Sequence, residues 1–394
     1  MTALALLLAV CALLLLVSSY LVYPAVIFRL AARRPAEPAP APQSLSAEIV
    51  VSAADEESVI GQRVRDLLAQ EAPGLSRISV GCDGCQDRTA EEAASAAQAS
   101  PERLRAGVNV RVVEFGQRRG KAAVVNDLVS ASSADVIVFT DANTGFEPGA
   151  VRHLVEAFAD ASVGAACGRL LLESRGGARG TPEREFWDRE TRLKEAEGRL
   201  GVCLGANGAI YAARREWIAP LPGDSSMDDF LIPVSIARQG KRVIFVGAAV
   251  AREAASGDAA VEVRRRFRIG VGAGQVLRRE TWLWNLSRYR LLSIAFLCRK
   301  AARWLAPVFA LAAALAALFS PRLFATGAAL LGIAFLLLAV AAARPTLRGV
   351  PGKLYYFAVI NLALGIGVVA GLFGYGRPVW KRRAASETSA DRRA

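Results

Sequence analysis

The stretch Val136-Ile-Val-Phe-Thr-Asp-Ala-Asn143 decides the fold, because in it an apolar strand runs directly into an acidic residue, Asp141. The same pattern occurs twice earlier in the chain, where short apolar strands end at Asp55 and at Asp83. Strand and helix patterns alternate around these segments, with strands at 49–54, 78–82, 108–115, 136–140 and 163–172 and helices at 60–68, 122–129 and 150–158. This alternation predicts an α/β domain with a mostly parallel sheet covered on both faces.

The acidic residues at the strand ends are expected to meet. The carboxyl ends of parallel strands share one edge of a sheet, and ligands bind in the crevice at that edge. Converging carboxylates repel one another unless a cation neutralises them, and oxygen ligands favour Mg2+ or Mn2+. A divalent ion at a nucleotide-binding edge points to a diphosphate. The alternative, that acids stabilise helix N-termini, explains Glu56 and Glu57 better than Asp141.

Apolar runs predict that part of the chain lies in a bilayer. Residues 3–28 contain no charge and are followed by Arg29, which indicates a retained anchor with a cytoplasmic flank rather than a signal peptide. Further runs lie at about 305–319, 323–343 and 354–375. Three crossings would place the basic residues 381–383 outside, against the positive-inside tendency. Either the rule fails here or one run is not a full span, and the short 305–319 run is then the expected exception. The Trp282–Arg303 segment is expected at the membrane interface.

Charge and residue usage exclude several function classes. The formal charge is +13, but much of the excess flanks the apolar runs, and the predicted crevice is acidic, so nucleic-acid binding is not expected. The only histidine, His153, lies in a predicted helix, which argues against Ser-His-Asp or Cys-His catalysis. Cys82 and Cys85 form a C-x-x-C pair that zinc or redox chemistry would use, although small residues in a tight turn explain it more simply.

Several segments, in chain order, resemble the motifs of the family 2 inverting glycosyltransferases. They are Ser-Ala-Ala-Asp-Glu-Glu at 52–57, Cys-Asp-Gly-Cys-Gln-Asp at 82–87, Gly-Lys-Ala at 120–122 with Asn126, Asp-Ala-Asn at 141–143, Gly-Ala-Asn-Gly-Ala-Ile-Tyr at 205–211, Met-Asp-Asp-Phe at 227–230 and the arginine-rich segment 264–275. The resemblance covers about residues 47–280, and the layout is similar to membrane-bound synthases of cellulose, hyaluronan and poly-N-acetylglucosamine. It implies a GT-A, Rossmann-like nucleotide-sugar domain and sugar transfer with inversion.

The resemblance also implies roles for individual residues. Asp229 is the expected general base, which removes the proton of the acceptor hydroxyl. Asp141 and Asn143 are the expected ligands of Mg2+ or Mn2+, with Asn143 in place of a second aspartate and therefore with weaker binding. The expected donor-binding residues are Asp55, Glu57, Asp83, Lys121, Asp141, Arg265 and Arg268, and the expected acceptor-side residues are Gly205, Ala206, Asn207 and Asp228.

Some of these assignments leave alternatives open. Lys121 either reaches the donor or stays solvated. The arginines at 264–268 either cradle the pyrophosphate or face lipid. Phe267 and Val263 replace the tryptophan and glutamine of the family's Gln-x-x-Arg-Trp motif, which argues against a processive polymerase. The glycine-rich segment 270–274 lacks a preceding strand, so we do not interpret it as a dinucleotide site.

The sequence therefore predicts a membrane-bound glycosyltransferase at the cytoplasmic face of the inner membrane, using a nucleotide sugar, with UDP as the expected nucleotide. Its expected partners are that donor, a lipid-linked or saccharide acceptor and membrane lipids, without nucleic acid. The alternative is a non-catalytic scaffold or transport component with a degenerate sugar-nucleotide domain. The expected divisions are an anchor (1–30), a proline-rich linker (31–46), the GT-A domain (47–280), an interfacial region (281–303), membrane helices (304–376) and a basic tail (377–394).

Overall fold

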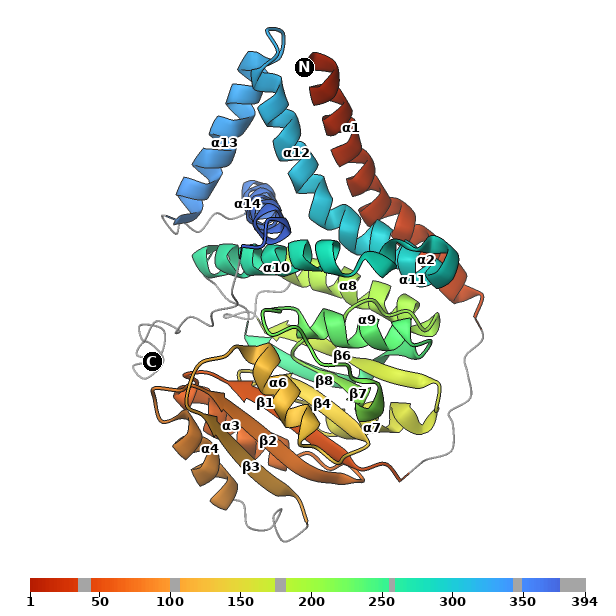
Figure 1. Cartoon of the computed structure of the whole chain (residues 1–394), viewed down its shortest axis with the longest axis vertical. Coiled ribbons are helices and arrows are strands. Elements are labelled where there is room, and N and C mark those ends of the chain that lie inside the picture. Colours follow the sequence, from red (N-terminus) through yellow and green to blue (C-terminus); the bar gives the residue numbers. More distant parts are fainter. Residues whose placement is uncertain (35–43, 100–106, 174–181, 255–258, 343–348, 376–394) are drawn as a thin grey trace. The chain divides into compact units, whose positions relative to one another are not determined.

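A computed structural model describes residues 1–34, 44–99, 107–173, 182–254, 259–342 and 349–375 (Figure 1). The expected basic tail and most of the proline-rich linker lie outside the described residues. The chain divides into two compact units. A sheet unit contains the strands, and a helical unit contains the first helices and the described residues from Ala259 onwards.

The sheet unit is built on one mixed sheet with the strand order β3-β2-β1-β4-β7-β6-β8-β5. Strands β3, β2, β1 and β4 are parallel, β7 is antiparallel to both of its neighbours, β8 is parallel to β6, and β5 is antiparallel to β8. The strand bounds are β1 Ala47–Ala53, β2 Leu75–Asp83, β3 Asn109–Phe115, β4 Val136–Asp141, β5 Gly145–Phe146, β6 Val163–Glu173, β7 Tyr211–Arg214 and β8 Arg242–Ala254. The expected α/β class and the expected strands are confirmed, whereas β5, β7 and β8 were not predicted.

Helices cover both faces of this sheet. On one face, Ile49 and Val51 of β1 share a core with α3 Glu57–Leu68, α4 Thr89–Gln98 and α7 Ala150–Glu156. On the other face, Val50 shares a core with α6 Lys121–Ser130 and α9 Asp228–Arg238. The alternation along β1 follows from the period of two in a strand, which sends successive side chains to opposite faces. The unit also contains most of α8 Pro182–Arg199 and the short helices η2 Ala157–Ala159 and η3 Arg215–Trp217.

Among the described residues of the helical unit, two helices are long and apolar enough to cross a membrane. The first is Thr2–Ala32, with 31 residues, in which the π-helical turn η1 Ser18–Val22 joins α1 Thr2–Val17 to α2 Tyr23–Ala32. The second is Leu286–Leu318, with 33 residues, formed by α11 Leu286–Ala295, the π-helical turn η5 Phe296–Ala301 and α12 Ala302–Leu318.

The second of these helices contains the apolar run 305–319, which we did not expect to cross the bilayer by itself. The apolar run at 305–319 is short, but the helix continues through the basic residues before it. Of these basic residues Arg299 is fully buried, whereas Lys300 and Arg303 are half-buried. The helix also has a kink at Arg290, whose backbone is not helical. The boundary expected at residue 303 falls inside this helix, and the 3-10 turn η4 Thr281–Trp284 precedes it.

Paired glycines join two other helices of this unit, α10 Ala259–Arg279 and α14 Gly349–Leu372. A Cβ atom on Gly270 would lie 2.9 Å from the Cα atom of Gly367, and one on Gly274 would lie 2.9 Å from the carbonyl carbon of Gly371. Each helix thus carries two glycines four residues apart, the spacing that lets helix backbones touch. This contact explains the glycine-rich segment 270–274. It also groups α10 with the helical unit, although we expected the GT-A domain to extend to residue 280. The remaining helix of the unit is α13 Phe324–Ala342.

Candidate functional site

The centre of the site is a lysine between two aspartates that come from distant parts of the chain. Lys121 begins α6, Asp141 ends β4 and Asp228 begins α9. The Nζ atom of Lys121 lies 2.8 Å from Oδ1 of Asp141 and 3.2 Å from Oδ2 of Asp228. The structure thus brings an expected donor residue, an expected metal ligand and an expected acceptor-side residue to one point at the carboxyl edge of the sheet.

Electrostatics keep this lysine charged. Burial alone would lower the pKa of Lys121, but the negative charges of Asp141, Asp228 and Asp229 more than offset burial and raise the pKa above its usual range. The hydrogen bond to Asp141 acts in the same direction. At neutral pH the site therefore holds an ammonium group among carboxylates, an arrangement suited to a ligand that carries both a cation and a polyphosphate.

The expected base, Asp229, faces the same space as Asp141. A Cβ atom on Gly208 would lie 3.6 Å from Oδ2 of Asp229 and 3.7 Å from Oδ2 of Asp141, so both carboxylates flank this glycine. The backbone N–H of Ala206 donates to the carbonyl oxygen of Asp229 at 2.7 Å, which fixes the 205–211 segment against the start of α9. Gly205 has a φ of 80°, a conformation that glycine adopts without strain.

A buried tyrosine holds the neighbouring carboxylate. The hydroxyl of Tyr211 donates to Oδ2 of Asp228 at 3.0 Å, and its ring stacks on Phe139 with 4.6 Å between the ring centroids. Burial, reinforced by the charge of Asp228, raises the pKa of Tyr211, so the phenol remains a hydrogen-bond donor. Tyr211 and Lys121 thus both contact the same oxygen of Asp228, whereas Tyr211 was expected only as the end of a motif.

Asn207 has a structural environment. It is buried, its Nδ2 donates to the carbonyl oxygen of Gly168 at 2.7 Å, and its Oδ1 accepts a hydrogen bond from the buried ammonium of Lys194. Its backbone N–H contacts the sulfur of Cys167 at 3.3 Å. The polar atoms of the Asn207 side chain already have protein partners. Its contact with an acceptor therefore stays a prediction.

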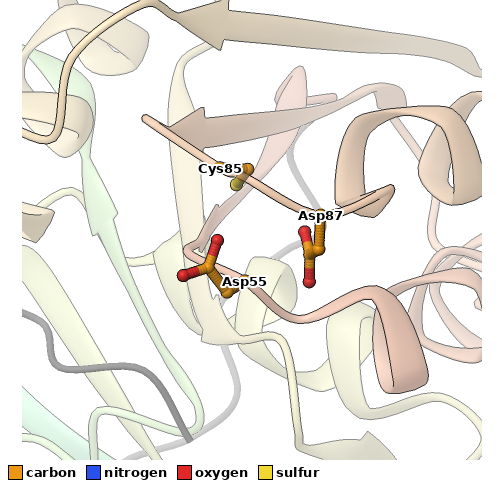
Figure 2. Close-up of side chains that lie close together, drawn as sticks. All are labelled: Asp55, Cys85 and Asp87. Carbon is orange, nitrogen blue, oxygen red and sulfur yellow. The ribbon is translucent and has the colours of Figure 1, made fainter.

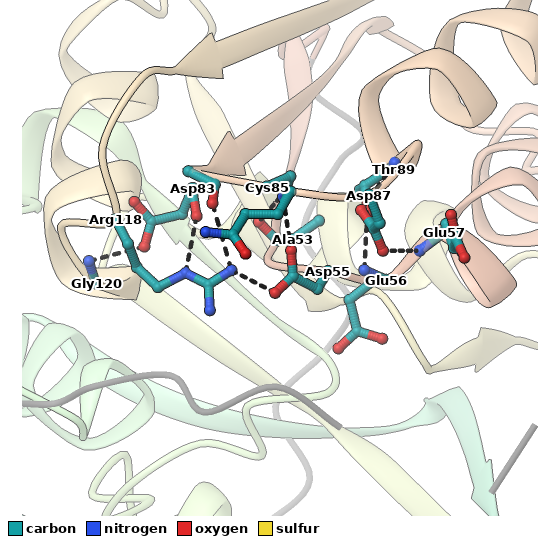
Figure 3. Close-up of polar contacts among 12 residues, drawn as sticks. Ala53, Asp55, Glu56, Glu57, Asp83, Cys85, Asp87, Thr89, Arg118 and Gly120 are labelled. Atoms are coloured by element: carbon teal, nitrogen blue, oxygen red, sulfur yellow. Dashed lines mark hydrogen bonds and ion pairs between the residues drawn. The ribbon is translucent and has the colours of Figure 1, made fainter. Parts of the chain in front are cut away.

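Asp83 is enclosed by the loop that follows β3 (Figure 3). The backbone N–H groups of Arg119 and Gly120 donate to its two carboxylate oxygens at 2.8 Å each, and the residue is 0% exposed. Gly120 has a φ of 94°, a backbone conformation that glycine adopts without strain. In this arrangement Asp83 positions the loop that leads into Lys121, and direct contact with a donor stays a prediction that would require the loop to open.

Asp55 is held by an arginine that the sequence did not single out. Arg118 donates to Oδ2 of Asp55 at 2.8 Å and to the carbonyl oxygen of Asp83 at 3.2 Å, so it ties the ends of β1 and β2 together (Figure 3). The backbone N–H of Gln86 donates to the other oxygen of Asp55 at 2.9 Å. Asp55 has a φ of 56°, and these contacts stabilise that uncommon backbone conformation.

Cys85, Asp87 and Asp55 come close enough for their side-chain ligand atoms to lie within 4.8 Å of one another (Figure 2). The carboxylate of Asp87, however, accepts hydrogen bonds from Thr89 at 3.0 Å and from the backbone N–H of Glu57 at 3.2 Å. These contacts connect the start of α3 to the start of α4. These hydrogen bonds between the two loops therefore explain why the three side chains lie close together.

Glu57 takes part in the same connection between the starts of α3 and α4. Its Oε2 accepts a hydrogen bond from the backbone N–H of Arg88 at 3.2 Å. The alternative of a residue at a helix N-terminus thus fits Glu57 well, and its expected contact with a donor stays a prediction.

The C-x-x-C pair consists of free thiols in different environments. A hydrogen bond from the thiol of Cys82 is the main cause that lowers the pKa of Cys85 to about 7, while the same hydrogen bond and burial raise the pKa of Cys82. Cys85 also lies 3.7 Å from the carbonyl oxygen of Ala53. Cys82 lies in β2 itself and only Cys85 lies in the turn that follows, so the simpler interpretation of small residues in a tight turn fits Cys85 alone. A pKa of about 7 is in the range of reactive cysteines.

The second expected metal ligand, Asn143, contacts the end of β8. Its Nδ2 donates to Oε1 of Glu253 at 2.9 Å. Asp141 and Asn143 thus offer a carboxylate and an amide oxygen, which are ligands suited to Mg2+ or Mn2+. Glu253 was not predicted, because β8 was not recognised.

A buried arginine supports the strand that carries Asp141. Arg63 of α3 is 2% exposed, donates to the hydroxyl of Thr140 at 2.6 Å and pairs with Asp66. Burial lowers its pKa to about 10 despite the charge of Asp66. Its place on the apolar face of an amphipathic helix is a sequence signal that would have identified it.

The remaining expected donor residues, Arg265 and Arg268, lie on α10 in the helical unit. Arg265 lies 3.8 Å from Oε2 of Glu262, one turn earlier on the same helix. Their contact with a pyrophosphate stays a prediction.

Comparisons with known proteins give similarities along most of the chain. The chain is 24% identical over 265 residues to an N-acetylglucosaminyltransferase of Azorhizobium caulinodans, with 64% of this chain and 62% of that protein covered. It is 26% identical over 238 residues to one of Rhizobium leguminosarum bv. viciae, with 57% and 54% covered. The chain thus spans less than two thirds of the length of these relatives.

A solved structure shares the fold. The mannosyltransferase PcManGT from Pyrobaculum calidifontis, in complex with GDP-Man and Mn2+, matches with a TM-score of 0.65 and 22% identity, covering 93% of this chain and 99% of that one. The model of the family described as glycosyltransferase like family 2 matches residues 42–272. Because this match covers more than half of the 394 residues, the chain belongs to that family and is a glycosyltransferase.

Proposed function

We propose that this glycosyltransferase works at a membrane and transfers a sugar, with inversion, from a UDP-sugar to a lipid-linked or saccharide acceptor. The observation that carries the proposal is the meeting of Lys121, Asp141 and Asp228 within 3.2 Å at the carboxyl edge of the sheet. Relatives described as N-acetylglucosaminyltransferases make UDP-N-acetylglucosamine the first donor to test.

In the proposed reaction Asp229 is the base. Its carboxylate accepts the proton of the acceptor hydroxyl as that oxygen attacks the anomeric carbon from the side opposite the nucleotide. The start of α9 and the hydrogen bond from Ala206 to its carbonyl oxygen position it. The missing side chain of Gly208 leaves room between Asp229 and Asp141 for the reacting groups.

Asp141 and Asn143 are the proposed ligands of Mg2+ or Mn2+. A bound divalent ion would neutralise the leaving diphosphate. Lys121 adds a second positive charge at the same place and keeps Asp141 and Asp228 from repelling each other before the donor binds. Asp228, fixed by Tyr211, is proposed to orient the acceptor beside the base.

The membrane part of the proposal rests on the two long apolar helices at Thr2–Ala32 and Leu286–Leu318. An enzyme held at the inner face of a bilayer on both sides of its catalytic segment meets lipid-linked acceptors at the surface. A soluble saccharide that serves as acceptor equally well as every lipid fraction would contradict this part.

Nucleotide release tests the reaction. The protein, purified in detergent with native lipid, is offered UDP-N-acetylglucosamine and other UDP-sugars with Mn2+, Mg2+ or chelator. We expect release of UDP that depends on metal and falls by about 10³-fold or more in Asp229→Asn, because the base is lost. Asp127→Asn, an exposed aspartate on α6, is the matched control and should retain full activity. Equal rates in Asp229→Asn and wild type would refute the assignment of the base.

A further inference from the structure

Asn143 lies where the resemblance implies a second metal-binding aspartate, and its side chain contacts a glutamate at the end of β8. Its Nδ2 donates to Oε1 of Glu253 at 2.9 Å. An ionised carboxylate only accepts hydrogen bonds, so the amide nitrogen must face Glu253. The amide oxygen of Asn143 consequently points away from Glu253, and oxygen is the atom that a hard cation requires.

The backbone fixes this contact. Directly after Asn143, β5 pairs with β8 through Gly145 and Arg252, and the N–H of Glu147 donates to the carbonyl oxygen of Val250 at 3.0 Å. Arg252 also bridges Glu147 and Glu173, with 2.9 Å to an oxygen of each. The segment after Asp141 is therefore held along β8 by these contacts. Glu253, at the end of that strand, consequently lies next to Asn143.

We propose that Glu253 is a positioning residue of the metal site, which turns the Oδ1 atom of Asn143 toward the cation and supplies the negative charge that an asparagine lacks. This inference rests on the proposed metal site of Asp141 and Asn143. The charge of Glu253 would act on a bound ion through the amide group of Asn143 and would not require direct coordination. Carboxylates that orient metal ligands in this way commonly contribute 10- to 100-fold in metal affinity.

The proposal makes a charge-exchange prediction. Glu253→Gln removes the charge and lets the amide of Asn143 turn, and we expect Mn2+ affinity to fall by at least about 10-fold. Asn143→Asp in the Glu253→Gln background returns one carboxylate to the site, and we expect it to restore affinity to within a few-fold of wild type. Asn143→Asp alone sets two carboxylates against each other, and we expect it to gain less than it does in the double variant.

Mn2+ binding to the full-length protein in detergent, followed by electron paramagnetic resonance of the free ion with and without UDP, measures these affinities without activity. Glu156→Gln is the matched control, because it removes an exposed glutamate on α7 whose ion pairs are with Arg152 and His153 of the same helix, and it should leave Mn2+ affinity unchanged. Asp141→Asn should abolish binding. Thermal unfolding of each variant in chelator reports whether it is folded.

The outcomes separate the inference from the proposed function. Loss in Glu253→Gln with recovery in the double variant supports the inference. If wild type binds Mn2+ through Asp141 but Glu253→Gln binds equally well, the inference is overturned and the proposed metal site stands. Loss in Glu253→Gln without recovery in a folded double variant also overturns it. If wild type binds no Mn2+, the metal site and the inference fall together, while UDP release still tests the transfer reaction.

Discussion

Replacing Lys121 with methionine removes the cation from between the carboxylates and keeps most of the side-chain volume. At an effective dielectric constant of about 20, its distances of 2.8 Å to Asp141 and 3.2 Å to Asp228 correspond to gross attractions of about 5–6 kcal/mol each. Desolvation of the lysine offsets much of this, and Asp141, 38% exposed, is partly screened by water. We expect Lys121→Met to lower the free energy of unfolding by about 2–3 kcal/mol.

The assay is thermal unfolding in chelator at pH 8. The pKa of Lys121 is raised by folding, so its contribution is fully present below the ordinary lysine pKa of about 10.4 and is lost only as pH rises above it. For a domain of this size, we expect a fall in Tm of about 4–12 °C. Mn2+ should recover part of that loss, because it returns positive charge to the carboxylates.

Lys241→Met is the matched control. Lys241 lies over the ring of Trp217, with 4.5 Å from Nζ to the ring centroid, and away from the carboxylates. The Lys241→Met substitution should change Tm little, and Mn2+ should shift the Tm of this variant as much as that of wild type. A Lys121→Met protein that unfolds at the wild-type temperature in chelator, with the wild-type response to Mn2+, would refute the argument that this lysine neutralises the site.

Three further predictions concern stability and reactivity. Gly274→Leu places a side chain against the backbone of α14 and should lower Tm by several degrees. Gly332→Leu is the control and should leave Tm unchanged, because a Cβ at that position meets nothing within 4 Å. Equal effects of the two variants would contradict the glycine contact. The rate of Cys85 alkylation, followed by mass spectrometry, should be half-maximal near pH 7, and its pH midpoint should shift upward in Cys82→Ala. A rate that rises only above pH 8 in wild type would oppose this assignment. Asp83→Asn turns an amide toward backbone N–H groups and should destabilise by about 2–3 kcal/mol in chemical unfolding, and a wild-type midpoint would count against the loop role.

The first half of the sheet was predictable because its signals are local. The strands that end at Asp55, Asp83 and Asp141 are apolar runs with acidic ends, and parallel pairing places those ends together. Strand β7 escaped prediction because Tyr211–Arg214 is a strand only through its pairing with β4 and β6. Strand β8 was likewise not recognised, and Glu253 at its end was missed with it.

At the site, residue types were easier to predict than contacts. Lys121 and Asp141 were expected at the donor, but not paired with each other. Arg118 acts on Asp55 across 63 positions of sequence, a contact that no local pattern encodes. The enclosure of Asp83 depends on where the loop after β3 closes, and its backbone N–H groups carry no side-chain signature.

The glycine contact between α10 and α14 also sets an order of events during synthesis. About 70 residues separate the end of α10 at Arg279 from the start of α14 at Gly349, which takes roughly 4–14 s to translate. Throughout that interval the helix that carries Arg265 and Arg268 has been translated without the partner that its glycines fit. A nascent chain that stalls within this interval has a translated sheet domain but an undocked α10, so the helical unit is completed only by one of its last-made helices.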